Sequence, residues 1–280
     1  MHRAWLVFLV RAYIRVLTYV SPRATGRFAL RLFSTPRRHH RPAWERQIAE
    51  SGEPLTLGPG LAARAWGSGP LVLLLHGWEG RGTQLGRFVA PFVDAGYRAI
   101  AVDGPAHGES PGTRTNLIEH TEALRRIGHD LGPLAAIVAH SFGGATTTLA
   151  IERGLDVRSV VLIASPTSVH DIIGRFAVLV GLRDQSLTAF REALEQEAGV
   201  PLREVEIYER VSALQVPALI VHDRGDREVP FHDAERLTAR WPGASLYPTE
   251  GLGHRRILKD GDVIHRAVEF VTNVALSARA

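Results

Sequence analysis

From Pro54 onward the chain alternates short aliphatic runs with longer stretches of helical periodicity, and no other feature constrains the fold as strongly. Parallel strands need crossover helices, and strands that are apolar throughout need cover on both faces. The sequence therefore predicts a doubly wound, mostly parallel α/β sheet. The expected strands are residues 54–57, 61–66, 71–75, 97–102, 134–139, 158–163, 218–221 and 245–248, and the expected helices are residues 83–95, 116–131, 142–153, 233–241 and 262–276.

One connection between two predicted strands, residues 166–215, is much longer than an ordinary loop. Ser168 and Asp171 have the spacing of a capping box, and apolar residues at helical spacing follow them. A second helix is expected over residues 186–198, because Gly199 is a typical helix terminator. We therefore expect a helical cap inserted into the sheet domain.

The amino-terminal segment is strongly basic. Residues 1–46 hold ten arginines against the single carboxylate of Glu45, a charge of +9, and because the whole chain has a net charge of +4 the remainder carries −5. These arginines are interleaved with apolar runs and do not form a dense basic tract, so binding to nucleic acid is not expected.

Residues 5–10 are apolar, but Arg11 and Arg15 interrupt the run before it reaches the roughly 20 residues that a membrane span needs. No clean cleavage site of small residues precedes these arginines, which disfavours a signal peptide. An amphipathic helix fits best, either packed on the body of the protein or lying on a membrane surface. Pro22 and Pro36 divide the segment into two short helices. We expect a cytoplasmic protein, with peripheral membrane contact through residues 1–20 left open and the oligomeric state undetermined.

The chain contains no cysteine, which excludes disulfides, thiolate metal sites and a cysteine nucleophile. Ser141 stands between a predicted buried strand and a predicted helix, with Ala139 two residues before it and Gly143 two residues after it. A nucleophile elbow needs small residues at these two positions because the serine sits in a strained, tight turn. Ala139 departs from the usual glycine but is the smallest substitute. The alternative is a serine that caps the helix beginning at Phe142.

A second loop, His76, Gly77 and Trp78, follows the strand at residues 71–75. A glycine there lets the backbone pass close to a substrate, and the backbone amides of Trp78 and Phe142 would together form an oxyanion hole. We expect His76 to be a structural histidine that bonds loop backbone. The glycines of this loop lack the spacing of a dinucleotide-binding turn.

Two carboxylates, Asp223 and Asp226, follow the strand at residues 218–221, and His254 lies in a glycine-rich loop after the last strand. A histidine in such a loop is the expected general base. Only one of the two acids can orient it. The other is expected to pair with neighbouring arginines in solvent, where an ion pair contributes about 1 kcal/mol at most.

The whole pattern resembles the α/β-hydrolase superfamily over about residues 54–275, and within it bacterial serine esterases with a small helical cap. The residues that carry the resemblance are Asp103, His107, Gly108 and Ser110; Ala139, Ser141 and Gly143; Asp226, Val229 and Pro230; and Gly253 and His254. The resemblance implies the α/β-hydrolase fold, with an N-terminal helical extension over residues 1–50 and a hydrolase domain over residues 51–280. It assigns the triad acid to Asp226, four residues before Pro230, and it makes the loop from Asp103 to Ser110 structural.

The predicted activity is acyl transfer to water by a serine hydrolase of the carboxylesterase kind. Ser141 is the expected nucleophile, His254 the general base and Asp226 the orienting acid, with Trp78 and Phe142 holding the oxyanion. Neither a cofactor nor a metal is expected. The expected substrate is a small-molecule ester or thioester with a small to medium apolar acyl group. An acyltransferase, a lipase-like enzyme at a membrane surface and a non-catalytic binding protein remain alternatives.

Overall fold

The computed structural model describes residues 2–278, and the side chains of residues 5–278. These residues form two compact units: the chain up to Thr35 together with Ser168–Glu206, and Pro36–Thr167 together with the chain from Ile207 onward. The N-terminal helices are thus grouped with the helices of the long insertion. This grouping differs from the predicted division of the chain at residue 50.

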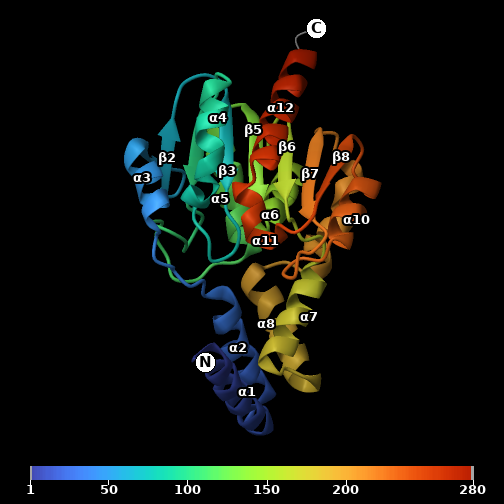
Figure 1. Cartoon of the computed structure of the whole chain (residues 1–280). Coiled ribbons are helices and arrows are strands. Elements are labelled where there is room, and N and C mark those ends of the chain that lie inside the picture. The colour runs from blue at the N-terminus through green and yellow to red at the C-terminus, as the bar shows by residue number, and fades with distance from the viewer. Residues whose placement is uncertain (1, 279–280) are drawn as a thin grey trace. The chain divides into compact units, whose positions relative to one another are not determined.

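The second unit is built on one sheet (Figure 1), which contains eight strands within the described part of the chain, in the order β1-β2-β4-β3-β5-β6-β7-β8. The strand pairs β1–β2 and β2–β4 are antiparallel, and all other neighbours are parallel. The predicted mostly parallel sheet is therefore confirmed. The strands are β1 (Glu53–Leu57), β2 (Leu61–Trp66), β3 (Leu71–Leu75), β4 (Arg98–Val102), β5 (Leu134–His140), β6 (Val160–Ile163), β7 (Ala218–Asp223) and β8 (Ala244–Thr249).

Helices cover both faces of this sheet, as its apolar strands require. Alternate strand residues such as Leu74 and Val138 pack with η1, α4 and α12, while their neighbours Leu73 and Ile137 are also fully buried. Helices α5 and α6 contact each other, and α6 contacts β5. The helical elements of this unit are α3 (Ala43–Ser51), η1 (Gly82–Phe88), α4 (Val89–Asp94), α5 (Leu117–Leu131), α6 (Phe142–Glu152), α9 (Ile207–Arg210), η3 (Val211–Ala213), α10 (His232–Arg240), α11 (Gly253–Arg256), η4 (Ile257–Lys259) and α12 (Gly261–Ser277).

Helix α3 is an element that the sequence did not predict. Glu45 on α3 is buried and accepts a 2.6 Å hydrogen bond from Arg81 Nε, just before η1. Thr83 Oγ1 also donates to the same carboxylate oxygen. Removing either charge would leave the other buried and unpaired, which typically costs about 3–5 kcal/mol. This ion pair therefore anchors α3 beside η1.

The first unit consists of α1 (His2–Val20), α2 (Pro22–Ser34), α7 (Val169–Val180), α8 (Asp184–Ala198) and η2 (Leu202–Val205). The half-buried rings of Phe33 and Phe176 pack with the buried ring of Phe190, and the three ring centroids lie 5.0–5.6 Å apart. Helices α2 and α8 approach so closely that a Cβ atom at Gly26 would lie 2.5 Å from the backbone of Ala189. No helix among the described residues has the length and apolar character needed to cross a bilayer.

Candidate active site

Ser141 lies in a tight turn between β5 and α6. Its backbone has φ 52° and ψ −119°, and a positive φ is unfavourable for a residue with a side chain. The Ser141 amide donates to the carbonyl oxygen of Ile163 at 2.8 Å, so the turn is held against the end of β6. Ala139, two residues earlier, is fully buried within β5. The turn has the geometry of a nucleophile elbow with alanine in place of the first glycine.

Glycines surround this turn because other backbone and side-chain atoms come very close to it. A Cβ atom at Gly77 would lie 3.0 Å from Ser141 Cβ, and one at Gly143 would lie 2.6 Å from the carbonyl oxygen of His76. At Gly144 a Cβ atom would lie 2.5 Å from Ser165 Oγ. A side chain at Gly77 or Gly143 would force the loop after β3 away from the turn, and one at Gly144 would displace Ser165, which follows β6.

Trp78 and Phe142, the two residues proposed for the oxyanion hole, lie where the loop after β3 approaches the serine turn. Phe142 is the first residue of α6, where a backbone N–H has no acceptor within the helix. Trp78 follows Gly77, and its ring packs edge-on against the ring of Phe142 at 5.3 Å between centroids. The loop after β3 and the start of α6 are therefore neighbours, as an oxyanion hole requires.

His254 and Asp226 are hydrogen-bonded to each other. His254 Nδ1 lies 2.7 Å from Asp226 Oδ2, and both side chains are largely buried. The other oxygen, Oδ1, accepts from the backbone amides of Glu228 at 2.8 Å and Val229 at 3.0 Å. A carboxylate in this position fixes the imidazole with its proton on Nδ1, leaving Nε2 free to accept a proton.

Asp226 is held in its charged form. Burial alone would raise the pKa of Asp226, but hydrogen bonds from His222 and His254, the charge of His254 and the amide of Val229 together hold that pKa well below its ordinary value. His222 Nε2 lies 3.5 Å from Asp226 Oδ2 and 3.0 Å from the Val229 carbonyl oxygen. An ionised carboxylate at this point can stabilise an imidazolium.

His140 connects the serine turn to the histidine loop. Its Nε2 donates to the carbonyl oxygen of His254 at 2.9 Å, and the two rings lie 4.7 Å apart. Burial, then the nearby charge of His254, lowers the pKa of His140 to about 3, so the ring is neutral. Because His140 precedes Ser141, the hydrogen bond places the loop of His254 beside the elbow.

Within the described residues, the Ser141 hydroxyl makes no hydrogen bond to His254, and His254 Nε2 lies 4.0 Å from Glu228 Oε2. Catalytic hydrogen bonds between nucleophile and base often tighten only in the complex with substrate. Glu228 itself is paired with Arg255 through contacts of 3.1 and 3.3 Å. The structure thus brings the serine turn, His254 and Asp226 together, but the hydrogen bond between the Ser141 hydroxyl and His254 is not formed.

A family model described as the alpha/beta hydrolase family matches residues 72–267, which include all of these groups. The chain belongs to the alpha/beta hydrolase family. Its sequence is 23% identical over 249 residues to the AB hydrolase superfamily protein YisY of Bacillus subtilis, covering 74% of this chain and 93% of that protein. It is 27% identical over 235 residues to the pimeloyl-[acyl-carrier protein] methyl ester esterase of Aromatoleum aromaticum, covering 68% of this chain and 92% of that protein.

The fold of this hydrolase is also similar to that of solved structures. An esterase from Exiguobacterium antarcticum superimposes with a TM-score of 0.60 at 19% identity, covering 79% of this chain and 99% of the esterase. At that identity the likeness shows the fold alone. The predicted α/β-hydrolase fold is confirmed.

In this hydrolase Asp223 differs from its expected environment. It is 0% exposed and makes no pair with solvent-exposed arginines; its Oδ2 accepts from the Leu252 amide at 2.9 Å and from Thr249 Oγ1 at 3.0 Å, and its Oδ1 accepts from the Gly225 amide. Burial would raise its pKa, but the amides of Leu252 and Gly253 lead the interactions that hold the pKa of Asp223 below its ordinary value. Asp223 therefore supports the loop that carries His254.

The loop of the hydrolase after β4 is structural, as the resemblance implied. Asp103 accepts from the amides of Gly82 and Glu109, and His107 Nε2 accepts from the amide of Glu79. His76 Nε2 accepts from the Gly104 amide at 2.9 Å, and its Nδ1 donates to the Gly77 carbonyl oxygen. Burial lowers the pKa of His76 to about 4. His76 thus bonds loop backbone, as expected.

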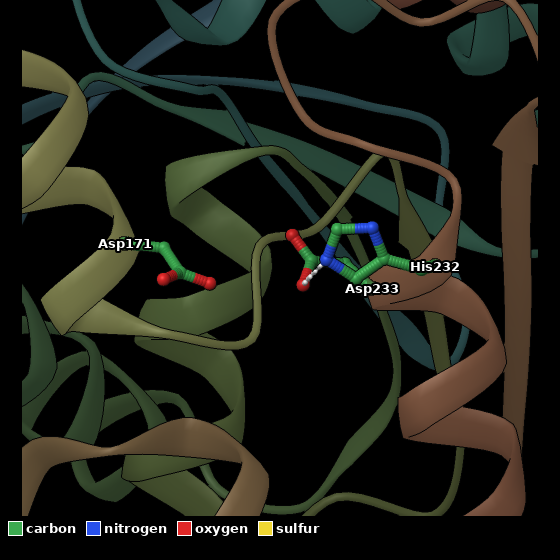
Figure 2. Close-up of side chains that lie close together, drawn as sticks. All are labelled: Asp171, His232 and Asp233. Atoms are coloured by element: carbon green, nitrogen blue, oxygen red, sulfur yellow. Dashed lines mark ion pairs between the residues drawn. The ribbon is translucent and has the colours of Figure 1, made fainter.

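Figure 2 draws the side chains of Asp171, His232 and Asp233, all of types that can bind a metal ion. His232 and Asp233 lie at the start of α10, with His232 Nε2 3.8 Å from Asp233 Oδ1, and Asp233 also accepts a hydrogen bond from the hydroxyl of Thr167. Asp171 belongs to α7 in the first unit. His232 and Asp233 alone offer fewer ligands than structural or catalytic zinc sites use.

Proposed function

We propose that this alpha/beta hydrolase is a serine esterase that cleaves carboxylic ester or thioester bonds through a covalent acyl-enzyme. His254 removes the proton from Ser141, and the serine oxygen attacks the acyl carbon of the substrate. The backbone amides of Trp78 and Phe142 stabilise the oxyanion, and the alcohol or thiol leaves with the proton from His254. Water, activated by His254, then releases the acid and restores the enzyme.

The observation that carries this proposal is the position of Ser141 in a positive-φ turn beside a hydrogen-bonded His254–Asp226 pair. A serine used only to cap α6 would need an extended backbone and a hydroxyl oxygen that accepts a hydrogen bond from a backbone N–H of the helix, and Ser141 has neither. The strained conformation instead exposes the hydroxyl at the end of β5.

Two observations bear on the type of substrate. The Aromatoleum relative is named as an esterase of a methyl ester, which supports ester chemistry for this chain. The insertion at residues 166–215 is rich in apolar side chains, and a cap of that composition favours acyl groups of small to medium length without charge. The substrate in this proposal is a small-molecule ester, and no cofactor takes part.

Initial rates on p-nitrophenyl esters of increasing acyl length test the proposal, with Ser141→Ala as the control. We expect hydrolysis of short to medium chains by the natural protein and a loss of about six orders of magnitude in the variant, as for other serine hydrolases. Adding an acceptor alcohol distinguishes an acyltransferase, which would form a new ester in preference to the free acid. A folded protein that binds these esters but turns none over would contradict the proposal and indicate a binding function.

A further inference from the structure

Helix α1 presents a large apolar face to solvent. Eight of its apolar side chains are at least half exposed: Trp5, Leu6, Phe8, Leu9, Tyr13, Val16, Tyr19 and Val20. Residues 5, 9, 16 and 20 recur at helical spacing and the other four flank them, so the eight side chains form one continuous face, which we call the α1 apolar face. Soluble monomeric proteins rarely leave contiguous apolar patches of this kind in water without a function.

The opposite side of α1 is packed within the first unit, so the exposed face is presented in a fixed orientation. Ile14 is 0% exposed, and Thr18 Oγ1 lies 3.5 Å from Thr25 Oγ1 of α2. At the border of the exposed face, Tyr13 also packs edge-on against Phe28 of α2 at 4.9 Å between ring centroids. The side chains of the α1 apolar face therefore cannot rotate into the core of this unit, because the opposite side of the helix already fills it. Any group that covers them must come from outside this unit.

Helix α7 extends this face. Arg11, on the edge of α1 between the packed and free sides, donates from Nε to the Leu179 carbonyl oxygen at 2.9 Å and from Nη2 to the Val178 carbonyl oxygen at 2.8 Å. Val178 and Leu179 are themselves exposed. The end of α7 is thus fixed beside α1 with two more apolar side chains facing solvent.

The same unit is positively charged along its first two helices. Arg23, Arg27 and Arg31 recur at intervals of four on α2 and are exposed, and Arg15 lies on the exposed side of α1. Residues 1–44 contain no Asp or Glu. Interfacial helices that bind anionic bilayers combine an apolar face containing Trp, Phe and Leu with arginines that contact headgroup phosphates.

We propose that the α1 apolar face docks on the surface of an anionic lipid bilayer, with its aromatic and aliphatic side chains entering the headgroup region and the arginines of α1 and α2 contacting lipid phosphates. Charge complementarity favours this partner over a second copy of the chain. A second copy applied to the same face would bring further arginines, and helices α1 and α2 supply no carboxylate to pair with them. This inference does not depend on the esterase activity.

Co-sedimentation of the full chain with vesicles tests the proposal, using phosphatidylcholine alone and phosphatidylcholine with phosphatidylglycerol. We expect binding to the anionic vesicles, weaker binding as salt rises, and little binding to the neutral ones. Of the five tryptophans, Trp5 is the exposed one on the α1 apolar face, while Trp241 is buried and the other three are half-buried in the second unit. Lipids brominated in the acyl chain should therefore quench emission in the natural protein and much less in Trp5→Phe.

Two paired variants separate the contributions. Phe8→Gln with Val16→Gln changes side chains that are 62% and 65% exposed, and we expect the partition constant to fall at least tenfold. Arg27→Gln with Arg31→Gln should lower it about fivefold or more and reduce its dependence on salt. Leu276→Gln is the matched control, because Leu276 is 58% exposed on α12, and it should bind as the natural protein does, as should Ser141→Ala.

Light scattering on the same samples completes the test. A monomer that binds anionic vesicles through these residues supports the proposal. A dimer that Phe8→Gln with Val16→Gln converts to monomer, without vesicle binding by the natural protein, would overturn it and identify the face as an interface between copies. Equal binding to neutral and anionic vesicles would also overturn it, because the arginines would then have no role.

Discussion

Asp223 and Asp226 both lie near His254, and replacing each by asparagine should reveal their different roles. The substitution keeps the shape of the side chain and replaces one carboxylate oxygen by an NH2 group. In Asp226→Asn the amide oxygen can keep the hydrogen bonds from Glu228 and Val229, and the amide nitrogen then faces His254 Nδ1. An N–H donor at that point favours the imidazole tautomer with its proton on Nε2, which cannot accept the proton of Ser141. Turnover should fall by roughly four orders of magnitude, with little change in KM.

Asp223→Asn should give a different result. Both carboxylate oxygens of Asp223 are acceptors, Oδ1 for the amide of Gly225 and Oδ2 for the amide of Leu252 and the hydroxyl of Thr249. One oxygen becomes an NH2 group, so at least one buried donor loses its acceptor, at about 1–3 kcal/mol for each group left unsatisfied. We expect a free energy of unfolding lower by about 2–4 kcal/mol and a turnover lower by about tenfold, because the loop of His254 loosens.

The assay is steady-state hydrolysis of p-nitrophenyl acetate together with denaturant unfolding for both variants. The predicted pattern is a stable, nearly inactive Asp226→Asn and a less stable, active Asp223→Asn. The opposite pattern, with turnover lost in a stable Asp223→Asn and retained in Asp226→Asn, would refute the assignment of the triad acid.

Three further predictions concern the turn and the buried histidines. Ser141→Ala should leave the melting temperature nearly unchanged in calorimetry, because alanine keeps the Cβ atom and so the same positive-φ strain, while the lost hydroxyl contributes little to the core. Burial lowers the pKa of His76 to about 4 from an ordinary 6.5, so the unfolded chain binds more protons than the folded one in this range. The free energy of unfolding should therefore fall as the pH drops from about 6.5 to 4, by about 3 kcal/mol for this residue. In denaturant titrations His76→Gln should flatten this pH dependence, and the control His129→Gln, at an exposed histidine, should not. His140→Phe keeps an aromatic ring but loses the donor to the His254 carbonyl oxygen, so turnover should fall about tenfold with KM nearly unchanged in the ester assay, and full activity would exclude a positioning role.

Local patterns in the sequence predicted the elements that position the site. The aliphatic runs gave β2 and β3 at their observed bounds, and the small residues around Ser141 predicted the turn that the structure places between β5 and α6. Such features depend on residues within a few positions of one another, since a strand needs a continuous apolar run and an elbow needs small neighbours.

Contacts between distant residues could not be predicted in this way. Helix α3 is held by the Glu45–Arg81 pair, and nothing in the nine residues of α3 signals that partner. Asp223 was expected in solvent because the residues beside it are charged, but its hydrogen-bond donors include Thr249, at the end of β8, and Leu252, in the loop that follows β8. The contact of His140 with the carbonyl oxygen of His254 spans 114 residues of sequence.

The central claim is that Ser141 is a nucleophile activated by its neighbours, and a fluorophosphonate probe tests it most directly. The probe should label the folded natural protein at one site, which peptide mass spectrometry should identify as Ser141. Labelling should be absent in Ser141→Ala and much slower in Asp226→Asn, while circular dichroism shows both variants folded. Labelling at another residue, or none in a folded sample of the natural protein, would contradict the account.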